Sequence, residues 1–353
     1  MTFEPSFLIQ CLMQLKGRIR SGGLILCAGL VMAAILPAHE GNSDTLRSDC
    51  LSPSRHLQLS WPQTDFSQCT VPLTDIISGG PGKDGIPAID EPRFGPVDEA
   101  EIDGREPVIS LQIDNIARAY PLRVLVWHEI VNDEISGQPV AVTYCPLCNT
   151  AIVFNRRLKD RILDFGTTGN LRFSDLVMYD RQTESWFQQY SGDGLFGAFA
   201  GESLDIIPSV LESFDRFKAR HPDGMVLMPP ENVQRIYGAN PYVGYDTGLF
   251  PFLFTGTVPD GVAPMEYVVI ADDKAWALSA LAEKGEITEG TLRLRWTPGQ
   301  ASALDTRAIA DGRDLGVVTV EQSTSDGYEP VAYKVSFAFV WHAFNPDAGE
   351  IIR

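Results

Sequence analysis

The residues most able to do chemistry are Cys145 and Cys148, which Pro146 and Leu147 separate. Two thiols three positions apart can exchange a disulfide with a substrate, and they can equally bind one soft metal ion. The proline stiffens the turn between them. Because the chain has no second Cys-x-x-Cys motif, this CPLC motif predicts one thiol-redox or metal site.

His128 is the first candidate partner of these cysteines. Pro121 suits the first turn of a helix, which we expect to continue to Val131. His128 then shares one inward face with Val124, Trp127 and Val131. An inward histidine is often only a core residue, but here it could lower a thiol pKa, transfer a proton or bind metal. We therefore predict that its ring lies within roughly 4 Å of the CPLC sulfurs, or one water further.

Four further side chains are weaker candidates. Asp175 and Asp180 stand at the two ends of a segment that alternates like a strand, so they are either acid–base groups or turn formers, and the pattern alone favours turns. Met178 lies between them and is a soft metal ligand or a core residue. His221 could complete a metal shell around the cysteines.

The elements that must position these residues are mostly short strands. We expect strands over 107–114, 116–120, 139–144 and 151–154, and helices over 121–131 and 213–220. A short β-like run follows the CPLC motif, whereas a thioredoxin-like fold needs a long helix there. The chain is therefore predicted to be α+β, rich in β-structure and not thioredoxin-like.

An internal repeat organises the second half of the chain. Residues 119–125 resemble 275–281, and residues 217–223 resemble 341–347 in the same order. We expect a first copy over 106–230, an aromatic, Pro- and Gly-rich join over 231–264, and a degraded second copy over 265–353. The aromatic residues of the join should be buried between the copies, or else form an exposed patch.

The second copy lacks the candidate site. Where the first copy has its histidine and two cysteines, the second has Lys284, Thr297 and Gln300. None of these supplies a thiolate or an imidazole, and the only histidine of this copy is His342. We therefore predict that the second copy is a structural partner without a site of its own.

The N-terminal region indicates export. Three basic residues precede an apolar run over 22–36, which is typical of a secretory signal over 1–38, with an uncleaved anchor as the alternative. An irregular lead-in over 39–105 follows, rich in Gly, Pro and acid, with no regular element expected from 79 to 106. In an oxidising compartment Cys50 and Cys69 should pair with each other. The expected location is extracytoplasmic, that is periplasmic or secreted.

Charge narrows the possible partners. Lys and Arg number 28 against 46 Asp and Glu, so the net charge is −18, which disfavours nucleic-acid binding. Contact with a membrane is expected only through an uncleaved N-terminal segment. The remaining partners are a small molecule, a thiol protein or a metal ion.

Five segments resemble a bacterial family catalogued as domain-of-unknown-function family 3179. They are WHEIVND (127–133), PVAVTYCPLCNTA (139–151), SDLVMYDRQTESW (174–186), KARHPD (218–223) and YGANPYVGYD (237–246). The resemblance implies an exported protein, and the selenocysteine described in some members implies redox chemistry at the thiol position. It implies no substrate. Members often have Gly after the second cysteine, where this chain has Asn149.

Three functions remain open from the sequence. In the first, one CPLC cysteine attacks a substrate disulfide or oxidant and the other resolves the intermediate, with His128, Asp175 or Asp180 as acid–base groups. In the second, the same cysteines and His128 bind copper or zinc, and Asp175, Met178 or His221 completes the shell. In the third, the motif is a structural staple of an interaction module.

Overall fold

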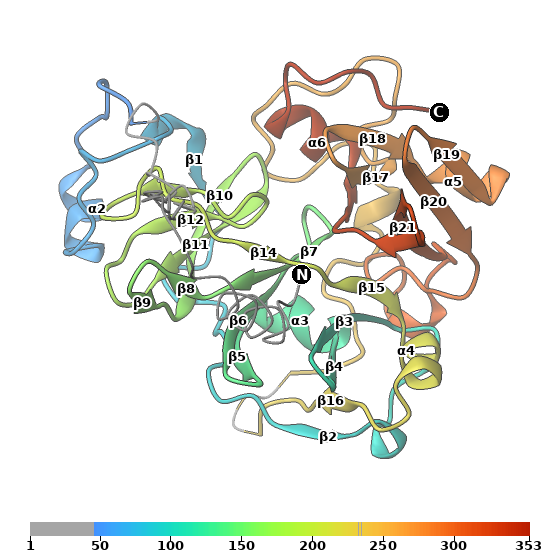
Figure 1. The fold of residues 1–353 in the computed structure, drawn as a ribbon. Coiled ribbons are helices and arrows are strands. Elements are labelled where there is room, and N and C mark those ends of the chain that lie inside the picture. The colour runs from blue at the N-terminus through green and yellow to red at the C-terminus, as the bar shows by residue number, and fades with distance from the viewer. Residues whose placement is uncertain (1–45, 232, 234) are drawn as a thin grey trace, which may run out of the picture. The chain divides into compact units, whose positions relative to one another are not determined.

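The computed structural model describes residues 46–231, 233 and 235–353. The expected signal or anchor over 1–38 lies outside these residues. Short strands and a few short helices make up the fold, which confirms an α+β protein rich in β-structure (Figure 1). Within the described part of the chain, no helix is both long and apolar enough to cross a membrane.

The lead-in contains more regular structure than the sequence predicts. Its elements are α2 (Arg55–Ser60), η3 (Leu73–Asp75), β1 (Ile76–Ser78), β2 (Phe94–Pro96) and η4 (Val97–Glu99). The expectation of no regular element from 79 to 106 is wrong at η4 and at β2, which pairs with the distant strand β16 (Met225–Leu227). A pairing partner more than 120 residues away leaves no local signal.

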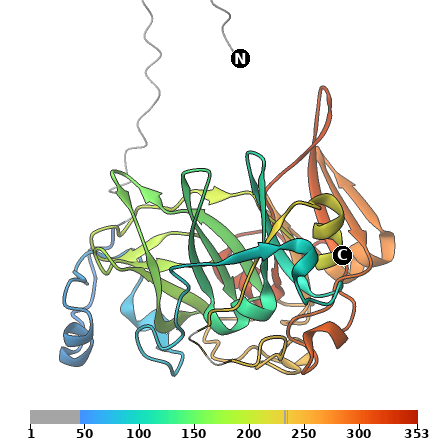
Figure 2. The ribbon, with the colours of Figure 1, turned by 90° about the horizontal axis from the view of Figure 1, so that it is seen from below.

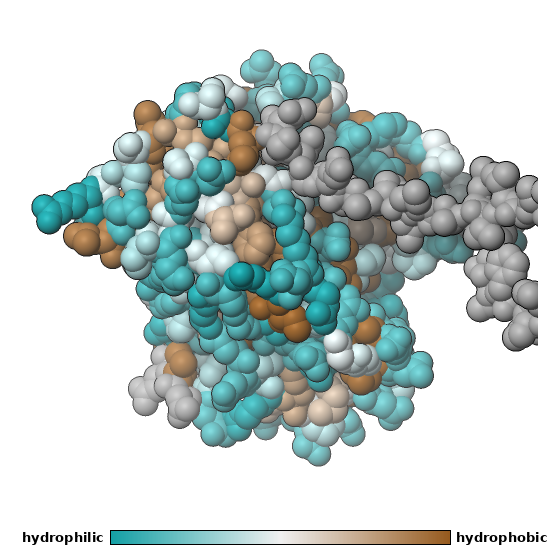
Figure 3. All heavy atoms as spheres, turned by 60° about the vertical axis from the view of Figure 1, so that its left-hand side comes forward, coloured by the Kyte–Doolittle hydropathy of each residue, from teal (hydrophilic) through white to brown (hydrophobic). Residues whose placement is uncertain are grey.

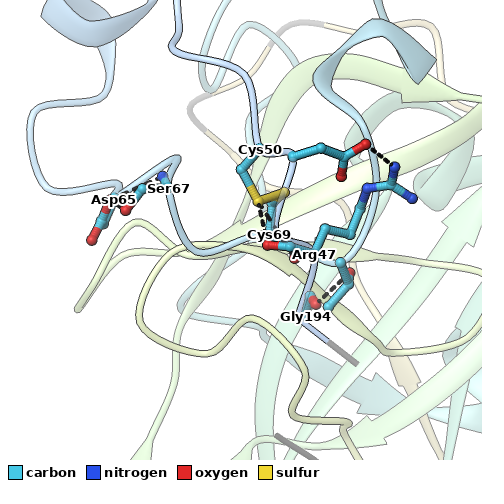
Figure 4. Close-up of a disulfide and its surroundings, with 8 residues drawn as sticks. Arg47, Cys50, Asp65, Ser67, Cys69 and Gly194 are labelled. Atoms are coloured by element: carbon cyan, nitrogen blue, oxygen red, sulfur yellow. Dashed lines mark hydrogen bonds and ion pairs between the residues drawn. A yellow bond between two sulfur atoms is a disulfide. The ribbon is translucent and has the colours of Figure 1, made fainter. Parts of the chain in front are cut away.

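A disulfide joins Cys50 to Cys69, as predicted (Figure 4). Cys69 is buried in an apolar cluster with Trp61, Phe66 and Trp186, and its backbone bridges Phe196. The bridge therefore holds the first described residues against the sheet that contains Trp186.

The CPLC motif lies in a unit built from a hairpin, a helix and a three-stranded meander. These elements are β3 (Pro107–Ile113), β4 (Ile116–Pro121), α3 (Leu122–His128), β5 (Ile130–Ile135), β6 (Gln138–Cys145) and β7 (Thr150–Asn155). The predicted strands are confirmed, but the helix ends at His128 and not at Val131. It stops because Glu129 adopts a left-handed backbone conformation with φ 59°, after which β5 pairs with β6.

A second sheet, β1-β10-β11-β12-β13, lies next to this meander (Figures 1 and 2). The strands that follow β7 are β8 (Arg157–Leu158), β9 (Arg161–Ile162), β10 (Phe165–Arg172), β11 (Asp175–Asp180), β12 (Trp186–Gln188), β13 (Gly194–Phe196), β14 (Ile206–Ile207) and β15 (Val210–Ser213). Helix α4 (Phe214–Arg220) comes next, close to the predicted 213–220. β14 pairs with β7 and β15 with β3, so the chain returns to the first unit.

After the join the chain again runs strand, strand, helix, strand, strand, as it does from β3 to β6. This part of the chain comprises β17 (Tyr267–Ala271), β18 (Lys274–Ala277), α5 (Leu278–Lys284), β19 (Glu286–Glu289), β20 (Leu292–Thr297), η6 (Ile309–Asp311), β21 (Val317–Thr324), β22 (Gly327–Pro330), β23 (Lys334–Phe337) and α6 (Ala338–Phe344). β23 pairs with β17 as β15 pairs with β3. The residue after each helix also accepts a similar backbone hydrogen bond. The Glu129 carbonyl, after α3, accepts from the Tyr144 N–H, and the Gly285 carbonyl, after α5, accepts from the Trp296 N–H.

The join (231–264) is only partly buried. It contains η5 (Tyr245–Thr247) and follows the lower edge of the molecule in Figure 2, yellow to tan. Tyr242, Tyr245 and Phe254 pack against the core, but Phe250 and Phe252 are exposed. The expectation that the aromatic residues are buried is therefore wrong for these two.

Candidate functional site

The CPLC motif forms the turn of the β6–β7 hairpin. Cys145 ends β6 and pairs with Thr150 at the start of β7. Within the turn, Cys148 donates its N–H to the Cys145 carbonyl at 3.2 Å. Asn149 then takes a left-handed conformation, φ 50°, which asparagine tolerates better than most residues. No helix starts at the motif, so both sulfurs stand at the end of a sheet, as predicted for a fold that is not thioredoxin-like.

The turn is fixed from outside by the second half of the chain. The Ser336 hydroxyl of β23 donates to the Cys148 carbonyl at 2.9 Å, and the Tyr245 hydroxyl donates to the Leu147 carbonyl at 2.9 Å. The Asn149 amide donates to the Val335 carbonyl at 3.4 Å. These contacts hold the backbone of the turn from Leu147 to Asn149 in one position.

Asp175 is the carboxylate that the fold brings to the cysteines. It begins β11, which belongs to the neighbouring sheet. The ligand atoms of Cys145, Cys148 and Asp175 all lie within 4.8 Å of one another, and all three residues are buried. Both cysteines are free thiols. The structure thus groups three of the residues singled out from the sequence.

Hydrogen bonds from neighbouring residues orient the Asp175 carboxylate. Its Oδ1 accepts hydrogen bonds from the Gln188 side chain at 2.6 Å and from the Tyr190 backbone N–H at 2.9 Å. Thr150 donates weakly to Oδ2 at 3.4 Å. Burial nevertheless raises the pKa of Asp175 to about 6, because desolvation outweighs these bonds.

Within the described residues, no cation is among the groups that shift the pKa of either thiol, although Lys334 interacts with the neighbouring Asp175. Burial, together with nearby acidic groups, raises the pKa of Cys145, and burial with the neighbouring thiol raises the pKa of Cys148 well above its usual value. A reactive cysteine normally needs the opposite electrostatics. Both thiols are therefore neutral near pH 7 unless something positive enters the site.

Glu129 is the site residue that the sequence analysis missed. Its backbone lies opposite Tyr144, the residue before Cys145, and its side chain lines a pocket of about 390 Å³. Burial and the nearby Asp175 raise the pKa of Glu129 to about 8. The signal that could have found it is the resemblance of 119–125 to 275–281, which places Glu129 opposite Gly285 when it is continued by four residues, because glycine is the usual residue at a helix end with positive φ.

His128 is not part of the cluster that Cys145, Cys148 and Asp175 form. Its Nδ1–H donates to the Pro87 carbonyl at 2.8 Å, and its Nε2 accepts from the Tyr237 hydroxyl at 2.9 Å. Both ring nitrogens are thus used, and burial lowers the pKa of the ring. Because the helix ends at His128, the next residue, Glu129, lines the pocket.

The remaining candidates lie elsewhere. Asp180 forms a turn, since its carboxylate accepts bonds from the N–H groups of Thr183 and Ser185 at 2.7 and 3.0 Å. Met178 is fully buried in the core. His221 caps the end of α4 and packs against Phe217, and it does not belong to the cysteine cluster.

The pocket beside the cluster is mostly apolar. Its wall includes Leu147 of the CPLC turn, Leu176 next to Asp175, and the aromatic residues Tyr242 and Tyr245 of the join. Glu129 is the one acidic residue in this wall. A small, largely apolar molecule would fit a wall of this composition.

The family follows from a comparison with known proteins. A family model described as a protein of unknown function, DUF3179, matches residues 83–348, a span that includes Glu129 and all three residues of the cluster. The chain belongs to the DUF3179 family. No curated protein and no solved structure matches it. The function of this DUF3179 protein must therefore be argued from its own geometry.

Proposed function

We propose that the chain is a soft-metal binding protein whose centre is Cys145, Cys148 and Asp175. The observation that carries this proposal is the convergence of two thiols and one carboxylate within 4.8 Å in a buried site. Sulfurs bound to one tetrahedral zinc lie roughly 3.8 Å apart, since each Zn–S bond is about 2.3 Å. Small side-chain rotations would therefore bring all three donors onto one ion.

Electrostatics support a cation in this site. The raised pKa values of both thiols and of Asp175 are the response of acidic groups to burial, which Arg172 and Lys334 near Asp175 do not offset. A divalent ion would supply positive charge and displace the protons. The mixture of sulfur and oxygen donors favours zinc over copper(I), which prefers sulfur alone.

Three protein ligands leave one coordination position open, which is typical of catalytic or exchangeable zinc. Glu129 and the apolar pocket adjoin the cluster. The open position would thus be available to a water molecule or to a small ligand from the pocket.

Metal analysis of the full chain, purified without chelator, tests the proposal. We expect about one zinc per chain, with metal lost in Cys145→Ser and its affinity reduced at least tenfold in Asp175→Asn. Asp180→Asn is the matched control, because Asp180 is buried on the same strand but bonds only within its own turn. His128→Ala should also keep its metal. Equal metal content in wild type and Cys145→Ser would refute the proposal.

Thiol redox chemistry is the second candidate, and the position of Asp175 supports it. A buried carboxyl group with a pKa of about 6 beside Cys148 could accept the proton of that thiol when it attacks a mixed disulfide. A metal-free protein whose thiol count falls by two after mild oxidation, and which then oxidises a small dithiol, would favour this function over metal binding.

We also propose that 265–353 is a degraded copy of 106–230 that supports the centre without a site of its own. The repeated order of elements supports this, as do the matching helix ends. His221 and Asn345 follow α4 and α6 with nearly the same φ, −131° and −134°. Ser336 of the second copy bonds the Cys148 carbonyl, which is the contact through which it would act.

An extracytoplasmic location is likewise a proposal. The Cys50–Cys69 disulfide supports it, because such bridges persist in oxidising compartments. Fractionation of cells followed by detection of the chain, with and without residues 1–38, tests it directly.

A further inference from the structure

One surface loop of the join differs in character from the rest of this acidic chain. Residues 247–259 contain no charged residue, although 74 of the 353 residues are charged (28 + 46). Three large side chains at its tip are strongly exposed: Leu249 by 82%, Phe250 by 71% and Phe252 by 60%. Hydrophilic residues cover most of the face that Figure 3 shows.

Exposure of this kind is unfavourable in water and needs a partner. Moving one leucine or phenylalanine side chain out of water is worth roughly a tenfold or larger change in an equilibrium constant. Exposed clusters of this size mark protein or membrane contacts. The loop is therefore a binding surface. Its lack of charge and its backbone hydrogen bonds indicate which of these two kinds of partner it contacts.

The exposed part of the loop is short, because Leu253 lines the neighbouring pocket and Phe254 packs against the core. Backbone hydrogen bonds in the described structure flank Leu249 and Phe250: the Gly248 N–H donates to the Tyr245 carbonyl at 3.1 Å, and the Phe252 carbonyl accepts from the Ser174 hydroxyl at 2.6 Å. The tip between them carries apolar side chains on a backbone that water or lipid headgroups would satisfy. A lipid interface offers both environments within a few ångströms.

We propose that the 247–259 loop docks on a lipid bilayer, with Leu249, Phe250 and Phe252 in the interfacial layer. The loop has no basic residue and the chain is acidic, so the contact depends on burial of apolar surface and not on anionic lipid. The apolar pocket continues this surface, because Val243, Phe252 and Leu253 line its wall. A molecule dissolved in the bilayer would then have a short apolar path to Glu129.

Tryptophan fluorescence of the full chain tests the docking at the loop itself. In Phe250→Trp, the emission above the wild-type background should shift to the blue with vesicles of phosphatidylcholine, and lipids with brominated acyl chains should quench it. Leu59→Trp is the matched control, since Leu59 is exposed by 71% on α2 and should show neither effect. The signal should persist from low to molar NaCl, because screening weakens only charge contacts.

A second variant tests the energetics. Phe250→Ser with Phe252→Ser should weaken vesicle binding by roughly a hundredfold, or about tenfold for each side chain. If the N-terminal segment alone holds the chain on vesicles, binding persists but the Phe250→Trp signal does not change, and the proposal fails. A blue-shifted emission already present in buffer and unchanged by vesicles would show that the chain or a second copy covers the loop, and would also overturn it.

Discussion

Replacing Glu129 by glycine should make the metal-free protein more stable. Glu129 combines two unfavourable features, a left-handed backbone with φ 59° and a buried carboxyl group. A non-glycine residue in this conformation costs about 1–2 kcal/mol. The equivalent residue after α5 is Gly285, with φ 74°, which avoids both costs.

The contribution of the buried Glu129 carboxyl group to the free energy of unfolding depends on pH. The raised pKa determines whether stability rises or falls with pH. The carboxyl group titrates at about 8 in the folded chain and near 4.5 when unfolded, so between these values only the folded state keeps the proton. Stability is therefore highest below about pH 4.5 and falls by about 1.4 kcal/mol per pH unit until about pH 8. At pH 7 the free energy of unfolding is therefore about 3 kcal/mol lower than it is below about pH 4.5.

Chelator-treated wild type, Glu129→Gln and Glu129→Gly should be compared by urea unfolding at about pH 5 and about pH 8. Glutamine removes the charge but keeps the backbone strain, and glycine removes both at the cost of about 1 kcal/mol of chain entropy. We expect Glu129→Gly to exceed wild type by about 3 kcal/mol near neutral pH, and the gain to shrink at about pH 5.

The result that refutes this reasoning is equally specific. If Glu129→Gly is no more stable than wild type near neutral pH, neither the strain nor the buried charge is as described. If the difference between wild type and Glu129→Gln is the same at both pH values, Glu129 does not titrate with a raised pKa.

Three further predictions concern the surroundings of the centre. Cys50→Ala with Cys69→Ala should lower the free energy of unfolding by about 3 kcal/mol without loss of metal, and a loss of metal would mean that the bridge shapes the site. Asn149→Gly should keep the metal but lower stability by about 1 kcal/mol in urea unfolding, because the loss of the bond that the Tyr144 hydroxyl donates to Asn149 Oδ1 at 3.0 Å and of the bond to the Val335 carbonyl outweighs the relief at φ 50°, whereas Asn149→Val should destabilise the fold further, since it also keeps the backbone strain. Ser336→Ala should lower stability by about 1 kcal/mol through the lost bond to the Cys148 carbonyl, and it should increase the metal dissociation rate. An unchanged rate would mean that Ser336 does not support the metal centre.

Local patterns in the sequence were sufficient for several features. Alternating apolar residues on both sides of CPLC predicted the β6–β7 hairpin, and Cys50 and Cys69 were predicted to pair because they stand apart from the other two. In each case neighbouring residues along the chain carry the information, since period and spacing determine which face a side chain takes.

Only the tertiary structure decided which residues surround the sulfurs. Asp175 and Asp180 look alike in sequence, yet pairing of β11 with its neighbours places the first at the cysteines and the second in a turn. Helix α3 ends three residues earlier than its apolar pattern predicts, which directs His128 to Pro87 and Tyr237 and makes Glu129 part of the pocket wall. Strand pairing and helix ends depend on contacts between distant segments, and a single sequence does not encode such contacts in any local period.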